Sequence, residues 1–342
     1  MGKKLNDFKE KICKKGKPCG NSCISAIKNC LKSKKPGNPS QSTKTGNNSV
    51  KKKDPASQST KTAPESYKAD SSDHKALIDI GKGFSDQTIG KAVKSLDKAI
   101  SQKDAAFKNV RITKKGEAYK QDIKRLVELD KKAKLAEENL KSVAEETMRK
   151  IAAHHKISRK DAELWVDSVD TRGITGENKE ITFDALVDVY MLTGGQGSPR
   201  IKKITNQADR ASANKYTGEI ALEKKVDRQQ VFHEYAHFME FENRQLAVAS
   251  RKFIEDRATS AEPMKLKDID NSVPYGDNEM AFPGNFIHPY VGKIYGPSGW
   301  STEVISMGVE NFRDPKQMSS FYKQDPEHFN FVLGAILHSP IF

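Results

Sequence analysis

One short segment has the residue types and spacing of a catalytic metal site. Residues 233–237 of the 342-residue chain read His-Glu-Tyr-Ala-His, the pattern H-E-x-x-H. Residues four positions apart lie on one face of an α-helix, so His233 and His237 can bind a single ion. Neutral imidazole suits Zn²⁺, and Glu234 could take a proton from a water on that ion. The alternative is a pair of core histidines without a metal.

A catalytic zinc usually has three protein ligands and one open position. The metzincin pattern would need Gly at 240 and His at 243, and Glu240 and Asn243 exclude that class. Glu240 lies two turns beyond His233, so we expect it to be solvated or to support a ligand from behind. Glu303 is the stronger candidate for the third ligand. The alternative for Glu303 is an ordinary acidic residue at a helix N-terminus.

The elements that must position these residues can be predicted from capping and periodicity. Asp227 and Gln230 form a capping box for a helix that continues through Phe241. Before it, residues 218–223 alternate like a half-buried strand, with Ile220 and Leu222 on one face. Residues 301–312 predict a second helix, in which Glu303 lies in the first turn and Gly308 permits close approach to another helix.

Peptide hydrolysis also needs a hydrogen-bond donor for the developing oxyanion. Tyr290 and Tyr295 lie shortly before Glu303 and are candidates, as is His288. The alternative for each is a packing role. We further expect the strand at residues 218–223 to offer an edge to which an extended peptide adds by backbone hydrogen bonds.

HEYAH with a downstream helix that carries a glutamate is similar to the gluzincin clan of zinc metallopeptidases. Across about residues 209–337, five segments resemble a group of such domains in phage and prophage proteins, namely RASANKYTGEIAL, HEYAHFME, FIHPYVGKIYG, STEVISMGVENF and DPEHFNFVLGAIL. The resemblance implies His233, His237 and Glu303 as zinc ligands and Glu234 as general base. The interval from His237 to Glu303 is long for the clan, so residues 245–295 are expected to be a looped-out insertion.

The N-terminal quarter of the chain has a different character. Residues 1–75 contain 18 Lys, no Arg and 6 acidic residues, a net charge of +12 out of +14 for the whole chain. Residues 34–75 include two copies of SQSTKT, and their composition predicts a disordered linker. With no Arg and few aromatic residues, a solvated tether is favoured over contact with nucleic acid, which stays the alternative.

The only four cysteines, Cys13, Cys19, Cys23 and Cys30, lie within the first 30 residues. Their spacing allows a second, structural zinc site, two disulfides or free thiols. Because the rest of the chain has no cysteine, we expect it to fold without an oxidising compartment. The stretch GKPCGNSCIS also resembles short cysteine segments of phage head-morphogenesis proteins.

Residues 76–196 are predicted to be helical. We expect helices over about residues 86–106 and 117–155, with a buried side formed by Ile123, Leu126, Val127, Leu135, Leu140 and Val143. A capping box at Ser158 and Asp161 predicts a short helix through Val166. Thr182 is expected to cap another helix, which ends at Gly194-Gly195.

The sequence therefore predicts an α+β chain with a zincin-like catalytic domain. We expect a cysteine-containing basic segment at 1–33, a linker at 34–75, a helical region at 76–196 and the metallopeptidase domain at 197–342. The expected activity is zinc-dependent endopeptidase, with a protein or peptide as substrate and phage virion proteins as candidate partners. The alternatives are a non-catalytic zinc-binding virion or DNA-contacting protein and a toxin-like protease effector. We expect no signal peptide, no membrane contact, and a cytoplasmic or virion location.

Overall fold

Helices predominate over short strands in the computed structural model, which describes residues 16–19, 22–25, 71–113, 115–295 and 301–338. This mixture of helices and small sheets confirms the α+β prediction at that level. By their internal contacts the residues divide into two units, Met1–Glu65 and Ser66–Phe342.

In the first unit, the described residues form an antiparallel pair of strands, β1 (Gly16–Cys19) and β2 (Ser22–Ser25). Cys19 ends β1 and Cys23 lies in β2. Cys13 and Cys30 lie outside the described residues, so the structural zinc site stays a prediction. The predicted linker also lies outside them as far as residue 70, and its last residues begin helix α2.

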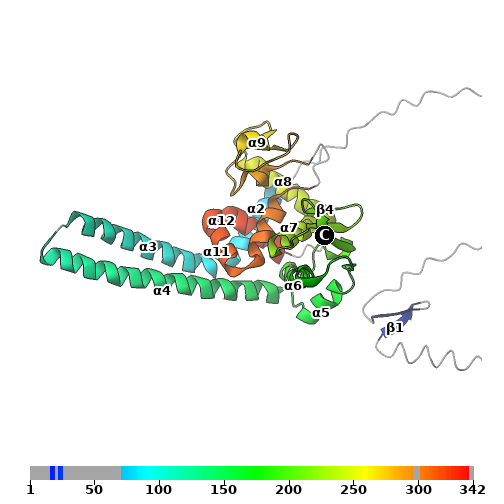
Figure 1. Ribbon diagram of the computed structural model, residues 1–342, viewed down its shortest axis with the longest axis horizontal. Helices are drawn as coiled ribbons and strands as arrows, with labels where there is room; N and C mark the ends of the chain where they lie inside the picture. The colour runs from blue at the N-terminus through cyan, green and yellow to red at the C-terminus, as the bar shows by residue number, and fades with distance from the viewer. Residues whose placement is uncertain (1–15, 20–21, 26–70, 114, 296–300, 339–342) are drawn as a thin grey trace, which may run out of the picture. The chain divides into compact units, whose positions relative to one another are not determined.

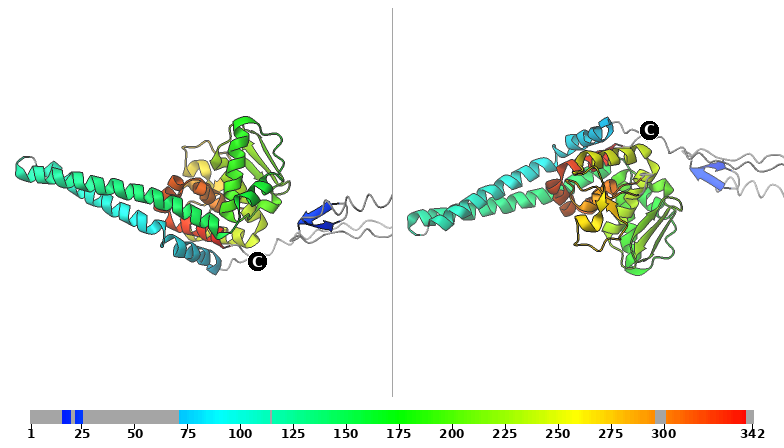
Figure 2. Two further views of the ribbon diagram at one scale, coloured as in Figure 1. Left: turned by 90° about the horizontal axis from the view of Figure 1, so that it is seen from below. Right: turned by 90° about the horizontal axis from the view of Figure 1, so that it is seen from above.

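The second unit begins with α2 (Ser71–Ser85), which packs along α12 (Pro326–Leu337). Helices α3 (Ile89–Ile112) and α4 (Glu117–His154) then form a long antiparallel hairpin. This hairpin projects from the other helices of the unit (Figures 1 and 2). Both helices were predicted, although α3 begins and ends later in the chain than expected.

The predicted buried side of α4 is partly wrong. Leu140 is buried and Leu126 and Val143 are half-buried. Ile123, Val127 and Leu135, however, are 36%, 49% and 67% exposed. Because α4 packs only against α3 along the projecting part of the hairpin, it buries a narrow seam there. A second apolar stripe has no partner among the described residues.

Two shorter helices connect the hairpin to the sheet. The predicted cap of α5 (Arg159–Val166) is confirmed, since the Ser158 side chain accepts a hydrogen bond from the backbone N–H of Asp161. Helix α6 (Gly176–Thr193) ends at Gly194 as predicted, and the φ of Gly194 is 69°, in the left-handed region. Its predicted start at Thr182 is wrong, because that hydroxyl donates to a carbonyl oxygen one turn back within the helix.

After the short 3-10 helix η1 (Ser198–Arg200), a three-stranded sheet has the order β3-β5-β4. Its strands are β3 (Lys203–Ala208), β4 (Ser212–Asn214) and β5 (Glu219–Glu223). β5 runs parallel to β3 and antiparallel to β4. Ile220 and Leu222 are buried as predicted. The prediction that β5 offers a free edge is wrong, because β5 is hydrogen-bonded on both sides, and β4 is an edge strand instead.

The sheet leads into two consecutive helices. Asp227 caps α7 (Arg228–Glu242) by accepting from the N–H of Gln230, as predicted. Asn243 caps α8 (Arg244–Arg257), which packs against α2, α7 and α10. The expectation that residues 245–295 are looped out is therefore wrong for α8, whose Phe253 and Ile254 are buried. The following residues form small elements, β6 (Met264–Lys265), α9 (Leu266–Ile269), β7 (Met280–Ala281) and η2 (Pro289–Gly292).

The last described elements are α10 (Val304–Val309), η3 (Glu310–Arg313), α11 (Pro315–Gln324) and α12. Of these, α10 and η3 pack against α7, and α11 and α12 pack against α10 and η3. As predicted, Gly308 allows close approach, since a Cβ there would overlap the side chain of Val332 in α12. Nearly all of α12 is buried. None of the described helices combines the length and apolar character that a bilayer span requires.

Two glycines of α2 provide a matched test of the contact between α2 and α12. A Cβ at Gly81 would overlap the backbone carbonyl of Asn330, whereas a Cβ at Gly83 would meet nothing. We expect Gly81→Ala to lower the free energy of unfolding by about 1–3 kcal/mol. Gly83→Ala should leave it unchanged or raise it by up to about 1 kcal/mol, because alanine favours helix. Urea unfolding followed by circular dichroism measures both, and equal effects would contradict the close packing.

Candidate metal centre

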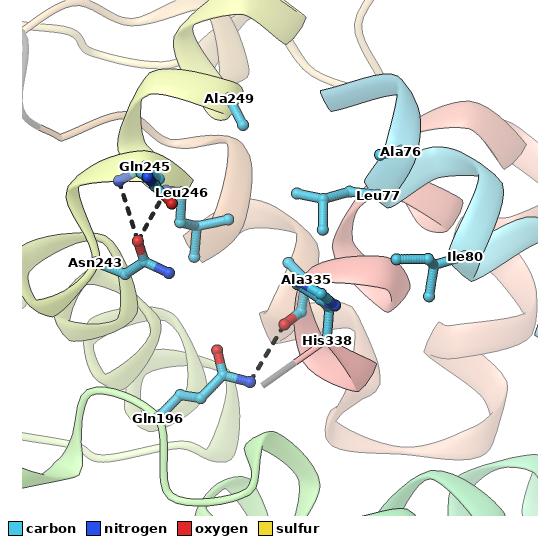
Figure 3. A pocket seen from close by; sticks show the side chains of 10 residues that line it. All are labelled: Ala76, Leu77, Ile80, Gln196, Asn243, Gln245, Leu246, Ala249, Ala335 and His338. Carbon is cyan, nitrogen blue, oxygen red and sulfur yellow. Dashed lines mark hydrogen bonds between the residues drawn. The ribbon is translucent and has the colours of Figure 1, made fainter. Parts of the chain in front are cut away.

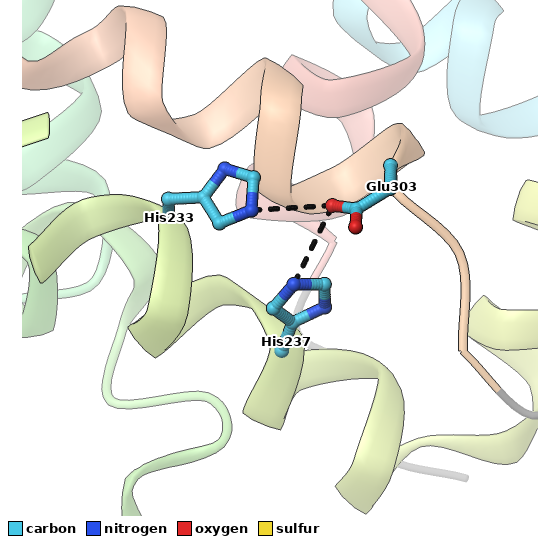
Figure 4. A group of neighbouring side chains, drawn as sticks. All are labelled: His233, His237 and Glu303. Carbon is cyan, nitrogen blue, oxygen red and sulfur yellow. Dashed lines mark ion pairs between the residues drawn. The ribbon is translucent and has the colours of Figure 1, made fainter. Parts of the chain in front are cut away.

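Three predicted ligands, His233, His237 and Glu303, come together at one point. The two histidines project from the same face of α7, and Glu303 precedes the first residue of α10 (Figure 4). Glu303 Oε2 lies 3.2 Å from Nε2 of His233 and 3.4 Å from Nε2 of His237. Among the described residues, this is the group of side chains that could hold a metal ion.

The spacing of these atoms fits a small tetrahedral ion. With metal–ligand distances of about 2.0–2.1 Å, neighbouring ligand atoms of a tetrahedron lie about 3.3 Å apart. The separations of 3.2 and 3.4 Å match that value. Three ligands leave a fourth position for a water molecule or a substrate.

A carboxylate that the sequence analysis missed sets the orientation of the first imidazole. Glu310 Oε2 lies 2.7 Å from His233 Nδ1 and accepts its proton, which leaves Nε2 as the metal-binding nitrogen. The other oxygen of Glu310 accepts from Gln229 Nε2 at 3.0 Å. Glu310 follows Glu303 by seven residues, which is about two turns of the helix predicted at residues 301–312. This spacing places both carboxylates on the same face of that helix and could have identified Glu310 as a second residue of the site.

Glu240 connects the two helices that carry the ligands. Its carboxylate accepts hydrogen bonds from the backbone N–H and the hydroxyl of Thr302, both at 2.7 Å. Glu240 is buried, so of the two expectations for it, support of a ligand is correct and solvation is wrong. Because Thr302 directly precedes Glu303, this contact fixes where α10 begins relative to α7. The Ser306 hydroxyl also donates to Glu303 Oε2, at 2.6 Å.

Burial and charge act in opposite directions on the three ligands. Burial would raise the pKa of Glu303, but His237 and His233 hold that pKa well below its usual range. Burial would lower the pKa of His233, yet its hydrogen bonds to Glu303 and Glu310 raise it well above the usual value. For His237, burial dominates and lowers the pKa to about 4. Without a metal at neutral pH, one imidazolium therefore balances the Glu303 carboxylate.

The ligands and Glu234 lie along a cleft of about 1210 Å³. The edge strand β4 borders this cleft, as do Tyr290, Tyr295 and His288. Glu234 is buried, and burial raises its pKa to about 7. A carboxyl group with a pKa near neutrality can both accept and return a proton.

The structure brings both candidate tyrosines to the centre. The Tyr295 hydroxyl donates to Glu303 Oε1. The Tyr290 hydroxyl accepts from Arg210 at 2.5 Å and from Lys293 at 2.6 Å. His288 lines the cleft as well, but its Nδ1 accepts from the backbone N–H of Tyr290 and caps η2. His288 therefore has a local structural role.

A second, smaller pocket of about 210 Å³ lies between α2, α8 and α12 (Figure 3). Its wall is largely apolar, with Leu77, Ile80 and Leu246 among its residues. Gln196 closes one side by donating to the backbone carbonyl of Ala335 at 3.2 Å. None of the predicted site residues lines it.

Comparisons of the chain with protein-family models, with curated proteins and with solved structures found no match. The resemblance to gluzincin domains of phage proteins therefore stays a prediction.

The raised pKa of His233 leads to a prediction about metal uptake. At pH 7 the metal-free His233 ring is protonated and Glu234, with a pKa of about 7, is partly protonated, so binding a cation should release about one proton from His233 and up to about half a proton from Glu234. Affinity should accordingly increase with pH up to the pKa of His233 and level off above it. Calorimetric titration with zinc in buffers of different ionisation enthalpy measures the proton count. Zero proton release at pH 7 would contradict the protonated state of His233.

Removing the carboxylate behind His233 tests its orienting role. We expect Glu310→Ala to weaken metal binding about 10–100-fold, because the Nδ1 proton loses its acceptor. Glu223→Ala serves as the control, since Glu223 lines the same cleft but makes no contact with either imidazole. Competition with a chromophoric chelator gives both affinities. Similar losses in the two variants would indicate a general charge effect instead.

Proposed function

We propose that this chain is a zinc-dependent endopeptidase. The observation that carries the proposal is the convergence of His233 Nε2, His237 Nε2 and Glu303 Oε2, with Glu234 beside them in an open cleft. Two imidazoles and one carboxylate form a ligand set that zinc favours, with a position left over for chemistry. When bound, zinc supplies activation of water and polarisation of a carbonyl group.

Glu234 is suited to the proton transfers of peptide hydrolysis. It follows the first ligand on α7, lines the cleft, and has a pKa of about 7 because it is buried. Its carboxylate can accept a proton from the attacking water and deliver it to the leaving amine. A nearby cation would lower this pKa, which increases the ionised fraction at neutral pH.

The two tyrosines supply candidate donors for the developing oxyanion. The Tyr290 oxygen accepts two hydrogen bonds from cations, and its hydroxyl is also hydrogen-bonded to that of Tyr295. Because Tyr295 donates to Glu303, Tyr290 can donate its own proton to Tyr295, a neutral partner that a substrate oxyanion can replace. Burial raises the pKa of Tyr290, which therefore keeps that proton at neutral pH. The Tyr295 hydroxyl donates its single proton to Glu303, so Tyr295 would have to break this hydrogen bond to contact a substrate. The geometry thus favours Tyr290 over Tyr295.

An extended peptide is the substrate shape that the cleft favours. The edge strand β4 borders the cleft, and its outer backbone groups can pair with a peptide strand. This replaces the edge that was predicted at β5. A zincin-like arrangement of sheet, metal-binding helix and glutamate helix, as in gluzincins of phage and prophage proteins, is part of the same proposal. A protein substrate of a virion or of a host cell is consistent with it.

Substitution of the general base tests the activity. We expect Glu234→Gln to retain the zinc content of the wild type and to reduce peptide cleavage by about 10²–10⁴, because proton transfer is lost. Cleavage of a mixed peptide library, followed by mass spectrometry, measures the activity. Elemental analysis measures the zinc.

The same experiment distinguishes the alternatives. A wild-type protein that binds zinc but cleaves nothing would support a zinc-binding virion or DNA-contacting protein. Equal cleavage by wild type and Glu234→Gln would contradict the role of Glu234. A toxin-like effector shares the chemistry and would show cleavage restricted to one host protein.

A further inference from the structure

Two cations and one carboxylate surround the Tyr290 hydroxyl at the side of the cleft. Arg210 comes from the turn between β3 and β4, and Lys293 directly follows η2. Besides donating to Tyr290, each pairs with Glu279, at 3.1 Å from Arg210 and 2.8 Å from Lys293. A single carboxylate is thus shared by two positive charges.

The charges of this cluster do not balance. Burial would raise the pKa of Glu279, but its hydrogen bonds from Lys293 and Gly276 lower that pKa to about 2. Glu279 is therefore ionised at neutral pH and neutralises only one of the two cations. Lys293 is 8% exposed, so water screens its charge poorly. A net positive charge is left at this side of the cleft.

Arg210 has the capacity to bind an anion. A guanidinium carries five N–H donors, and the bonds to Glu279 and Tyr290 use two of them. Its side chain is 60% exposed and lines the cleft. The remaining donors can form a paired contact with a carboxylate, for which the planar guanidinium is suited.

This cluster lies close to the metal centre. The Lys293 ammonium lies 4.5 Å from the ring centre of Tyr290 and 4.6 Å from that of Tyr295. Tyr295 in turn donates to the ligand Glu303. Arg210 is thus separated from the centre by the two tyrosines. Since an extended peptide advances about 3.3–3.6 Å per residue, a group bound by Arg210 lies within a few residues of the scissile bond.

Apart from Glu234 and Glu303 at the metal centre, the carboxylates of the cleft lie near the start of α7. Asp227 caps the first turn of α7, and Glu310 is hydrogen-bonded to Gln229 and His233 from that helix. Glu223 is adjacent to the same turn, where its backbone N–H donates to Gln230. Negative charge therefore gathers at the start of α7 and disfavours an acidic substrate group there, whereas the side of the cleft that holds Arg210 favours one.

We propose that Arg210, supported by Lys293, binds a substrate carboxylate near the scissile bond, so that the preferred substrates are acidic peptides. This inference rests on the proposed peptidase function. The carboxylate can come from an Asp or Glu side chain or from the C-terminus of a peptide, and the two sources share the same chemistry.

Matched peptides test this preference. Each pair of quenched fluorescent peptides carries Asp or Asn at one position beside the scissile bond, with the C-terminus either free or amidated. For zinc-loaded wild type, we expect kcat/KM to be about 10–100-fold higher for one acidic member, as one charged hydrogen-bonded contact implies. In Arg210→Gln the ratio within each pair should fall to about one. Because both members use Tyr290 alike, any disturbance of that tyrosine cancels in the ratio.

Two further variants control for charge and folding. Lys215→Gln removes another cation of the same cleft without affecting the Glu279 cluster, and it should preserve the ratio. Arg210→Lys keeps the charge but not the planar pair of donors, and it should give an intermediate ratio. Thermal melting verifies that each variant folds.

A binding measurement separates this inference from the activity. The zinc-loaded Glu234→Gln protein should bind the preferred acidic peptide about 10–100-fold more tightly than its neutral partner by fluorescence anisotropy. Adding Arg210→Gln should abolish that difference. Cleavage without preference for an acidic group would overturn the inference and leave the peptidase intact. Absence of cleavage together with Arg210-dependent binding would overturn the peptidase and leave carboxylate recognition standing.

Discussion

The structure depends on bringing two imidazoles and a carboxylate together in a largely buried place, with their ligand atoms within 4.8 Å of one another. A buried carboxylate is costly unless a positive charge compensates it. Glu303 is fully buried, and the two imidazoles beside it leave a place where a metal ion could supply that positive charge. The contact between Glu240 and Thr302 holds the two ligand-bearing helices in register. α12 packs against α10 and so helps to hold the Glu303 carboxylate against the two imidazoles.

The features that sequence analysis predicted well are local ones. The capping residues Ser158 and Asp227 act within one helical turn, and the spacing of His233 and His237 follows from helix geometry alone. Glu303 was predicted to be the third ligand from a predicted helix and from a resemblance, and the structure places it beside the two histidines. These inferences needed no knowledge of how distant elements pack.

The features that were missed or wrong depend on distant packing. Alternation predicted that β5 is a half-buried strand, but it contains no information on strand order, so β5 was assigned an edge that belongs to β4. α4 has more apolar residues than the narrow contact with α3 can bury, and Leu135 is therefore exposed. In the sequence, Arg210 is an ordinary cation in a loop. Its partners Glu279 and Tyr290 lie about 70 and 80 residues further along the chain, so only the folded structure shows their contact with it.

The pairing of α2 with α12 has a consequence for biosynthesis. The ribosome completes α2 roughly 240 residues before α12, so the surface of α2 around Gly81 lacks its α12 partner until then. Joining such distant segments carries a large loop-closure entropy, so this docking belongs to a late stage of folding. Since α12 also supports α10, the nascent chain has both histidines long before it can hold Glu303 in place. The candidate metal centre is thus assembled only after α12 has been synthesised.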